Sequence, residues 1–219
     1  MASRPWAGPI LGPLRLFPQP IRRLIVKDPT ACLMSEHIVD KHEMQGIVIF
    51  RHRAAFVASY KRLHWPSSRF LAQFLACAPL MKDWLQPFRS LLTKHCQSDS
   101  VESAAVLHGC LNTVLGGYTR HCSRLWPLSY EELSADPESQ FRNLHFRLGL
   151  PYDRDIQQHH AAICDPSHGT GPVHPHAVHR DSRLMNERWR GVLSPAECAR
   201  VRAVWEHFEV PLYMSDRAW

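Results

Sequence analysis

The 219-residue chain lacks several features that would place it in a common class of protein. It contains no run of about 18 apolar residues, so we expect no transmembrane span. The prolines of the first 20 residues interrupt any apolar stretch there, so we expect no secretory signal. These prolines are Pro5, Pro9, Pro13, Pro18 and Pro20.

The chain also lacks any Cys-x-x-Cys pair. Its seven cysteines are scattered, at positions 32, 77, 96, 110, 122, 164 and 198. Their odd number and spacing fit neither a disulfide framework nor a zinc site, so we expect reduced, mostly buried thiols in a cytoplasmic protein. Six histidines between His159 and His179 fit no standard zinc spacing either. We predict a Pro-, Gly- and His-rich loop over residues 164–179 and no metal site.

Positive charge is present but is not concentrated. The net charge of +6 suits an anionic ligand or partner. No block of Lys and Arg and no repeat of aromatic and basic residues occurs, so we do not expect nucleic-acid binding.

The order of apolar segments predicts an α/β fold, with a parallel sheet flanked by helices. Residues 1–23 are rich in proline and are interpreted as an extended arm, and residues 24–219 as one domain. We predict a buried strand at 24–29, a helix at 34–42 and a strand at 47–50 buried on both faces, which together form a right-handed βαβ unit. Further on we predict a helix at 101–122 and a strand at 126–128. A second helix is predicted to start at Asp136-Pro137, with Phe141, Leu144 and Leu148 on its buried face. A third is predicted to begin with the capping box Ser194-Pro195-x-Glu197.

The stretch from Ile47 to Trp65 carries the main functional signal. A strand that leads directly into a helix leaves backbone N–H groups and the positive end of the helix dipole at the junction, which can bind an anion. Arg51 ends the strand, and Ser59 stands eight residues later on the second helical turn. A guanidinium and a hydroxyl can both reach this junction. The alternative is an ordinary strand–helix junction with solvated basic residues.

The sequence Arg-His-x-x-x-x-Val-x-Ser-Tyr-Lys-Arg-Leu-x-Trp, from Arg51 to Trp65, resembles the 3′-phosphate-binding segment of PAPS-dependent sulfotransferases. The resemblance implies that Arg51 and Ser59 hold the 3′-phosphate of PAPS. Many relatives have Pro where this chain has Arg53, which keeps positive charge near the phosphate but loses the preset φ angle of proline.

Two further segments are similar to the same family. Lys27, in Lys-Asp-Pro, occupies the place of a strand lysine that approaches the transferred sulfuryl group. The segment from Tyr130 to Pro151, Tyr-Glu-Glu-Leu-x-x-Asp-Pro-x-x-x-Phe-x-x-Leu-x-x-x-Leu-Gly-Leu-Pro, resembles a second hallmark and implies that Tyr130 flanks the adenine. Without the resemblance, Lys27 is a strand-end lysine in water and Tyr130 a core tyrosine.

A cluster of Arg and Ser before Trp189-Arg190 resembles the family's C-terminal loop, which closes over the 3′-phosphate. Arg180 is the first choice for this contact and Arg183 the second. The alternative is a solvated charge cluster ahead of a helix.

The family's Gly-rich loop, which holds the 5′-phosphosulfate, has no counterpart in the chain. We therefore expect a P-loop NTPase-like sulfotransferase fold without its first β-α unit, from either a truncated open reading frame or a degenerate relative. The leading hypothesis is transfer of a sulfuryl group from PAPS to a hydroxyl or amine of a small-molecule or glycan acceptor. The alternative is a non-catalytic remnant that binds PAP or serves as an interaction module. The catalytic base is unassigned, because Pro29 stands where the cytosolic enzymes place a histidine and no spacing favours the nearby Asp28 or His37.

Overall fold

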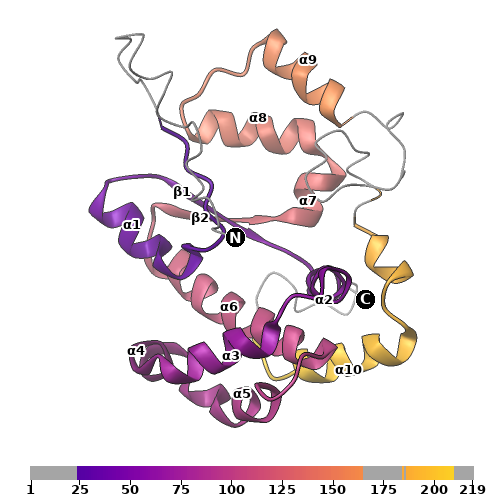
Figure 1. Cartoon of the computed structure of the whole chain (residues 1–219). Helices are drawn as coiled ribbons and strands as arrows, with labels where there is room; N and C mark the ends of the chain where they lie inside the picture. The colour runs from indigo at the N-terminus through magenta and orange to yellow at the C-terminus, as the bar shows by residue number, and fades with distance from the viewer. Residues whose placement is uncertain (1–23, 165–183, 185, 210–219) are drawn as a thin grey trace, which may run out of the picture. The chain divides into compact units, whose positions relative to one another are not determined.

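The structure, a computed structural model, describes residues 24–164, 184 and 186–209. The chain divides after Ala31 into two units, and the second unit holds all of the helices and strands described. Its fold is mostly helical, with a small parallel sheet of two strands, and is therefore α/β in the broad sense (Figure 1). None of the helices described combines the length and the apolar character that crossing a membrane requires.

The second unit is built mainly of helices, and its strands are short. In chain order, its helices and strands are α1 (Ser35–Lys41), β1 (Gly46–Phe50), α2 (Arg53–Leu63), α3 (Ser67–Ala76), α4 (Ala78–Leu80), α5 (Arg89–His95), α6 (Val101–His121), β2 (Leu125–Ser129), α7 (Tyr130–Ala135), α8 (Pro137–Arg147), α9 (Arg154–Ile163) and α10 (Pro195–Trp205). Short turns of other helical types are η2 (Cys32–Met34), η3 (Met81–Leu85), η4 (Gln86–Phe88) and η7 (Arg188–Gly191).

The parallel sheet does not pair the segments that the sequence predicted. Leu24, Ile25 and Val26 form no strand, and they are 73%, 85% and 60% exposed. Asp28 closes a turn instead, accepting hydrogen bonds from the backbone N–H and the hydroxyl of Thr30. The predicted βαβ unit is therefore wrong. A strand needs a partner, and the described part of the first unit contains none.

The parallel pair is formed by β1 and β2, in the register that runs from Gly46–Leu125 to Phe50–Ser129. Val48 and Phe50 are buried in the core, whereas Ile47 and Ile49 are 37% and 53% exposed. The predicted burial of this strand on both faces is therefore wrong, because within the described residues only one face of the small sheet is covered. The strand at β2 is confirmed, one residue longer at each end.

Helix α6 is the centre of the core and packs against α2, α3, α5 and α10. Ser100 and Ser103 cap its start reciprocally, which satisfies two N–H donors. Two of its glycines allow aromatic rings to approach closely. A Cβ on Gly109 would lie 2.4 Å from the Phe208 ring, and one on Gly117 would lie 2.0 Å from Trp84. The predicted helix at 101–122 is confirmed to within one residue.

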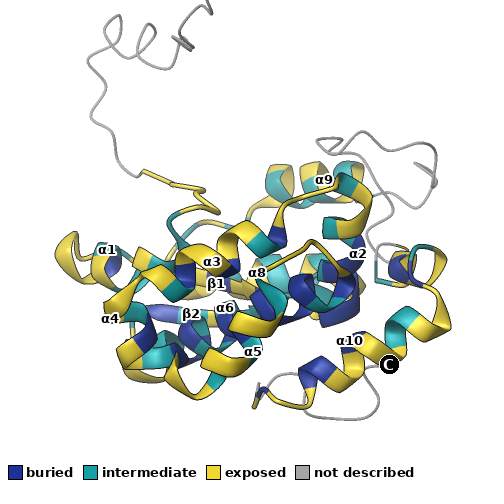
Figure 2. Cartoon of the chain, turned by 60° about the horizontal axis from the view of Figure 1, so that its bottom comes forward, coloured by how far each residue is buried: buried dark blue, intermediate teal, exposed yellow. Residues whose placement is uncertain are grey.

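The capping signals of the later helices are confirmed, but one prediction of burial is not. Asp136 caps α8 through the Ser139 N–H, and Ser194 and Glu197 form the predicted capping box of α10. Neither α8 nor α9 contains a fully buried residue (Figure 2), so the expected buried face of α8 is only partly covered. All seven cysteines are thiols rather than disulfides, as expected, but only Cys110 and Cys122 are buried.

Candidate functional site

The parallel register carries the two strand–helix junctions to the same place. Beyond the last pair, Phe50–Ser129, the next residues along the two strands are Arg51 and Tyr130. The Arg51 guanidinium carbon lies 4.9 Å from the centre of the Tyr130 ring, a cation–π contact. One residue further, the His52 N–H donates to Glu131 Oε1 at 2.9 Å. Parallel pairing therefore brings together two segments that lie far apart in the sequence.

Arg51 and Ser59 also lie together. Arg51 Nη1 donates to Ser59 Oγ at 3.3 Å, and both side chains are partly buried. The Ser59 hydroxyl, which accepts this bond, keeps its own proton for a further acceptor. Arg51 Nε is buried and has no hydrogen-bond partner among the described residues. Two donors at this separation can share one phosphate oxygen, or contact two oxygens of the same group.

These side chains line a pocket of about 600 Å³, which we call the arginine pocket. This is within the size range of small-molecule sites. Three arginines line it and none of the described lining residues is acidic, so the pocket is electropositive. Aromatic rings make up much of its remaining wall. The full lining is Arg51, Ala55, Phe56, Ala58, Ser59, Tyr60, Arg62, Leu63, Trp65, Tyr130, Arg188, Trp189 and Val192.

The start of α2 is occupied in part by a carboxylate of the chain itself. Glu131 accepts the His52 N–H, and its second oxygen accepts the Ser129 hydroxyl at 3.4 Å. The sequence predicted free backbone N–H groups at this junction for an anionic ligand. That expectation is wrong for His52, because the carboxylate after β2 lies against the helix start. The cationic groups that line the pocket are side chains.

A neutral histidine packs behind the pocket. His108 of α6 stacks on Phe56 and Trp205, with ring centres 4.3 and 5.0 Å apart. Burial, and then the positive charges of His52, Arg51 and Arg53, lower the pKa of His108 to about 3. His108 is therefore uncharged at neutral pH and adds no positive charge to the pocket.

The segment before α10 closes the pocket from the other side. Trp189 of η7 is buried and stacks on His52, with ring centres 5.4 Å apart. Asn186 Nδ2 donates to the Glu131 carbonyl at 3.1 Å, and Lys61 Nζ donates to the Val192 carbonyl at 3.1 Å. Arg188 projects into the lining from this segment. The sequence reasoning missed Arg188 and Arg62, although Arg188 directly precedes the Trp189-Arg190 pair that it singled out.

Three further predicted site residues are Lys27, Arg180 and Arg183. Arg180 and Arg183 lie outside the described residues, as do the histidines at positions 168, 174, 176 and 179. Lys27 belongs to the first unit, is exposed and lies on no strand. The hydrogen bonds from Thr30 lower the pKa of Asp28, which weakens it as a base. The described residues contain no group of three or more His, Cys, Asp or Glu side chains placed to hold a metal ion.

Searches against protein-family models, curated proteins and solved structures found no match to this chain. The assignment of a function therefore depends on the sequence motifs and on the geometry of the pocket.

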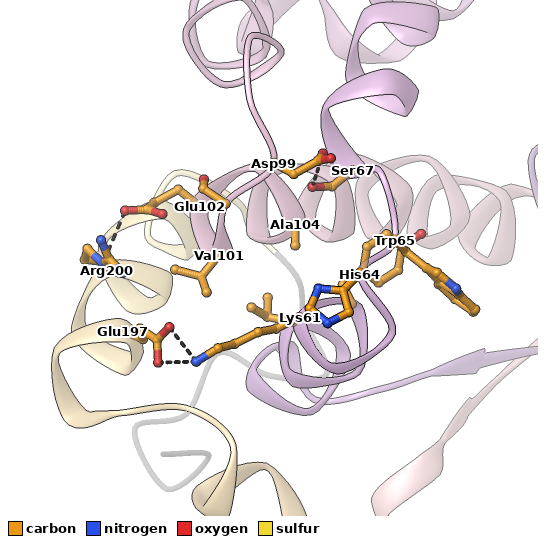
Figure 3. A pocket seen from close by; sticks show the side chains of 13 residues that line it. Lys61, His64, Trp65, Ser67, Asp99, Val101, Glu102, Ala104, Glu197 and Arg200 are labelled. Carbon is orange, nitrogen blue, oxygen red and sulfur yellow. Dashed lines mark hydrogen bonds and ion pairs between the residues drawn. The ribbon is translucent and has the colours of Figure 1, made fainter. Parts of the chain in front are cut away.

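A second pocket, of about 430 Å³, lies on the other side of α2, between that helix, the start of α6 and α10 (Figure 3). Its cations are paired: Lys61 Nζ lies 2.7 Å from Glu197 Oε1, and Arg200 Nε lies 3.3 Å from Glu102 Oε1. Hydrogen bonds from Lys61 and from the Ser194 N–H lower the pKa of Glu197 to about 2, so that pair stays charged at neutral pH. We call this the paired pocket.

Asp99, in the paired pocket, accepts a hydrogen bond from the Ser67 hydroxyl at 3.4 Å (Figure 3). It also accepts a hydrogen bond from the Ser68 N–H at 2.8 Å. Ser67 Oγ in turn lies 2.7 Å from Ser103 Oγ. These bonds connect the starts of α3 and α6, so we interpret the polar groups of the paired pocket as helix caps and ties between helices rather than as a catalytic group.

Proposed function

We propose that this chain is a PAPS-dependent sulfotransferase and that the arginine pocket binds its nucleotide. The observation that carries the proposal is the 3.3 Å approach of Arg51 Nη1 to Ser59 Oγ, in a pocket whose described lining contains arginines and no carboxylate. The guanidinium N–H groups of Arg51 and the free proton of Ser59 supply donors to the oxygens of a doubly charged phosphate. Ordinary solvated basic residues would not be held together in a half-buried pocket in this way.

In this assignment Arg51 and Ser59 hold the 3′-phosphate and the ring of Tyr130 lies beside the adenine. The partial negative charge on the Tyr130 ring face already holds the Arg51 guanidinium, which orients its donors. The resemblance also assigns Lys27 to the sulfuryl group, and Arg180 or Arg183 to the 3′-phosphate. PAPS supplies an activated sulfuryl group. Its S–O bond to the phosphate breaks, an S–O or S–N bond to the acceptor forms, and PAP leaves with the electron pair. The base that takes the acceptor's proton is not assigned.

A second candidate is a non-catalytic protein that binds PAP through the same pocket. The sequence favours it in one respect, because no Gly-rich loop for the phosphosulfate occurs in residues 1–219. Positioning by such a loop is a large part of catalysis in transfers of this kind. Both candidates require nucleotide binding, and they differ only in turnover.

Calorimetry with PAP tests the binding step that the two candidates share. We expect the wild-type chain to bind PAP, and Arg51→Ala to weaken binding at least about tenfold, since a charged hydrogen bond to phosphate contributes roughly 1.5–3 kcal/mol. Arg200→Ala, which removes an arginine from the paired pocket, is the matched control and should bind PAP normally. Absent binding, or equal binding by the wild type and Arg51→Ala, would remove the nucleotide proposal.

Turnover then separates the two candidates. The chain is incubated with PAPS and a panel of hydroxyl and amine acceptors, and PAP release is followed by chromatography. Acceptor-dependent release that Arg51→Ala reduces supports the enzyme. Tight PAP binding without release supports the binding protein.

A further inference from the structure

We infer that Arg62 and Arg188 form a second anion subsite at the exposed rim of the arginine pocket, for a phosphate or sulfate monoester. The inference deepens the proposed function, because it gives the pocket a ligand with two separate anionic groups. Arg51 and Ser59 would bind one group in the half-buried part, and the rim arginines would bind the other.

The two rim arginines reach the pocket from different segments. Arg62 lies in the last turn of α2 and Arg188 begins η7, and both side chains line the same pocket and are exposed. Neither has a carboxylate partner among the described residues, and no described lining residue is acidic. Arg190 shows the contrast within the same turn, since it pairs with Glu187 and does not line the pocket.

The turn that carries Arg188 is fixed to α2. Lys61, the neighbour of Arg62, donates to the Val192 carbonyl just after the turn and to Glu197 at the start of α10. Trp189, the neighbour of Arg188, is buried and stacked on His52. Each rim arginine thus sits beside an anchored residue, so the backbone that carries each of the two side chains is held in place before a ligand arrives.

The charges define the class of ligand. Guanidiniums bind the oxygens of phosphate and sulfate through paired N–H donors. Positive groups gathered at one pocket without internal carboxylates repel one another, and an anion relieves that repulsion. The second anion has two sources with the same chemistry. It is either the 5′-phosphate of a nucleotide whose 3′-phosphate is at Arg51, or a sulfate ester on a separate acceptor.

Calorimetry at about 50 mM salt, where charge interactions are weakly screened, distinguishes these sources. The proteins are the wild type, Arg62→Gln, Arg188→Gln and the control Arg190→Gln. The first arm compares adenosine 3′,5′-bisphosphate with adenosine 3′-phosphate. The second arm titrates galactose 6-sulfate into the free protein and into protein saturated with adenosine 3′-phosphate.

If the second anion belongs to the nucleotide, the bisphosphate binds about tenfold more tightly than the 3′-phosphate. Arg62→Gln and Arg188→Gln then remove most of that gain, while binding of the 3′-phosphate stays within about twofold. If the anion belongs to an acceptor, galactose 6-sulfate binds and both rim variants weaken it. Arg190→Gln leaves both arms unchanged. Either pattern supports the subsite.

The subsite is overturned if no probe binds, or if the rim variants lose no more than Arg190→Gln for every probe. Its failure is distinct from failure of the proposed function. Equal binding of the 3′-phosphate and the bisphosphate, both dependent on Arg51, leaves the nucleotide pocket in place and removes the rim subsite. If neither nucleotide binds, the proposed function fails, and the galactose 6-sulfate titration of the free protein alone decides the subsite.

Discussion

The pockets on the two sides of helix α2 differ in whether their cationic side chains are paired with carboxylates. In the paired pocket, Lys61 and Arg200 each face a carboxylate, so the charges cancel locally and tie α10 to α2 and α6. In the arginine pocket, Arg51, Arg62 and Arg188 share a lining without any acidic side chain among the described residues. The two sides of α2 thus border a structural set of charges and a set that is available to a ligand.

The difference has a physical consequence for ligand binding. A paired cation that binds an anion must first lose its carboxylate or share it, which offsets most of the gain. A cation held in place without a carboxylate has no such cost, and the energy spent in gathering like charges is recovered when the anion arrives. We therefore expect substitutions in the arginine pocket to affect affinity, and substitutions in the paired pocket to affect stability.

The largest expected effect comes from making the arginine pocket resemble the other one. Arg51→Glu places a carboxylate beside Ser59, where it repels phosphate, and should lower the affinity for PAP at least about 100-fold. Arg200→Glu makes the same change of charge in the paired pocket and should leave affinity within about threefold. Calorimetry measures both, with circular dichroism to check the fold. Similar losses in the two variants would mean that only net charge matters.

The next effect is on stability and concerns His108, which lies behind the arginine pocket. Its folded pKa of about 3 is below the usual 6.5, so between these pH values the unfolded chain binds a proton that the folded chain does not. Stability from this group is present above pH 6.5 and is lost as the pH falls toward 3, by up to about 1.4 kcal/mol per pH unit. His108→Phe keeps a ring between Phe56 and Trp205 and removes this dependence.

Urea unfolding at several pH values measures the effect. The free energy of unfolding of His108→Phe should rise relative to wild type by about 1.5 kcal/mol between pH 6.5 and pH 5. Other groups titrate in the same way in both proteins, so they do not contribute to the difference between the two free energies of unfolding. If the free energy of unfolding depended on pH equally in the two proteins, His108 would bind a proton as readily in the folded chain as in the unfolded chain.

A smaller expected effect is the difference in the free energy of unfolding between a substitution in the paired pocket and one in the arginine pocket. Lys61→Met removes a partly exposed ion pair with Glu197 and the bond to Val192, and should lower the free energy of unfolding by about 1 kcal/mol or less. Arg51→Met removes the contacts with Ser59 and Tyr130 but also removes a buried Nε that has no hydrogen-bond partner among the described residues, so we expect the two effects to offset and the free energy of unfolding to stay nearly unchanged. Thermal unfolding at neutral pH measures both. Equal losses would contradict the division of roles between the pockets.

Local signals in the sequence predicted the parts of the fold that depend on neighbouring residues. The Ser194–Glu197 capping box and the Asp136 cap are such signals, and both helices start where expected. The strand at Leu24–Val26 failed because composition indicates β propensity but not a pairing partner. The exposure of Ile47 and Ile49 was missed for a related reason, since burial of a strand depends on what covers the sheet.

The contacts of the site also divide into those that a local segment predicts and those that depend on distant parts of the chain. Arg51 and Ser59 are eight residues apart on one strand and the following helix, so their approach could be anticipated from the sequence. The contact of Arg51 with Tyr130 requires the register of β1 against β2, which no single segment encodes. The position of Arg188 depends on hydrogen bonds from Lys61 to residues more than 130 positions away. No local sequence pattern predicts these bonds.

The smallest expected change is at Tyr130, the aromatic wall of the arginine pocket. One face of its ring contacts the Arg51 guanidinium and the other face would stack on the base, and both interactions belong to the ring rather than to the hydroxyl. Tyr130→Phe should therefore leave the affinity for PAP within about twofold. Tyr130→Ala, which removes the ring, should lower the affinity about three- to tenfold, because base stacking contributes roughly 1 kcal/mol or more. Calorimetry compares the two variants. If Tyr130→Phe lost as much affinity for PAP as Tyr130→Ala, the hydroxyl rather than the ring would contact the ligand. The stacking role assigned to this side of the arginine pocket would then be wrong.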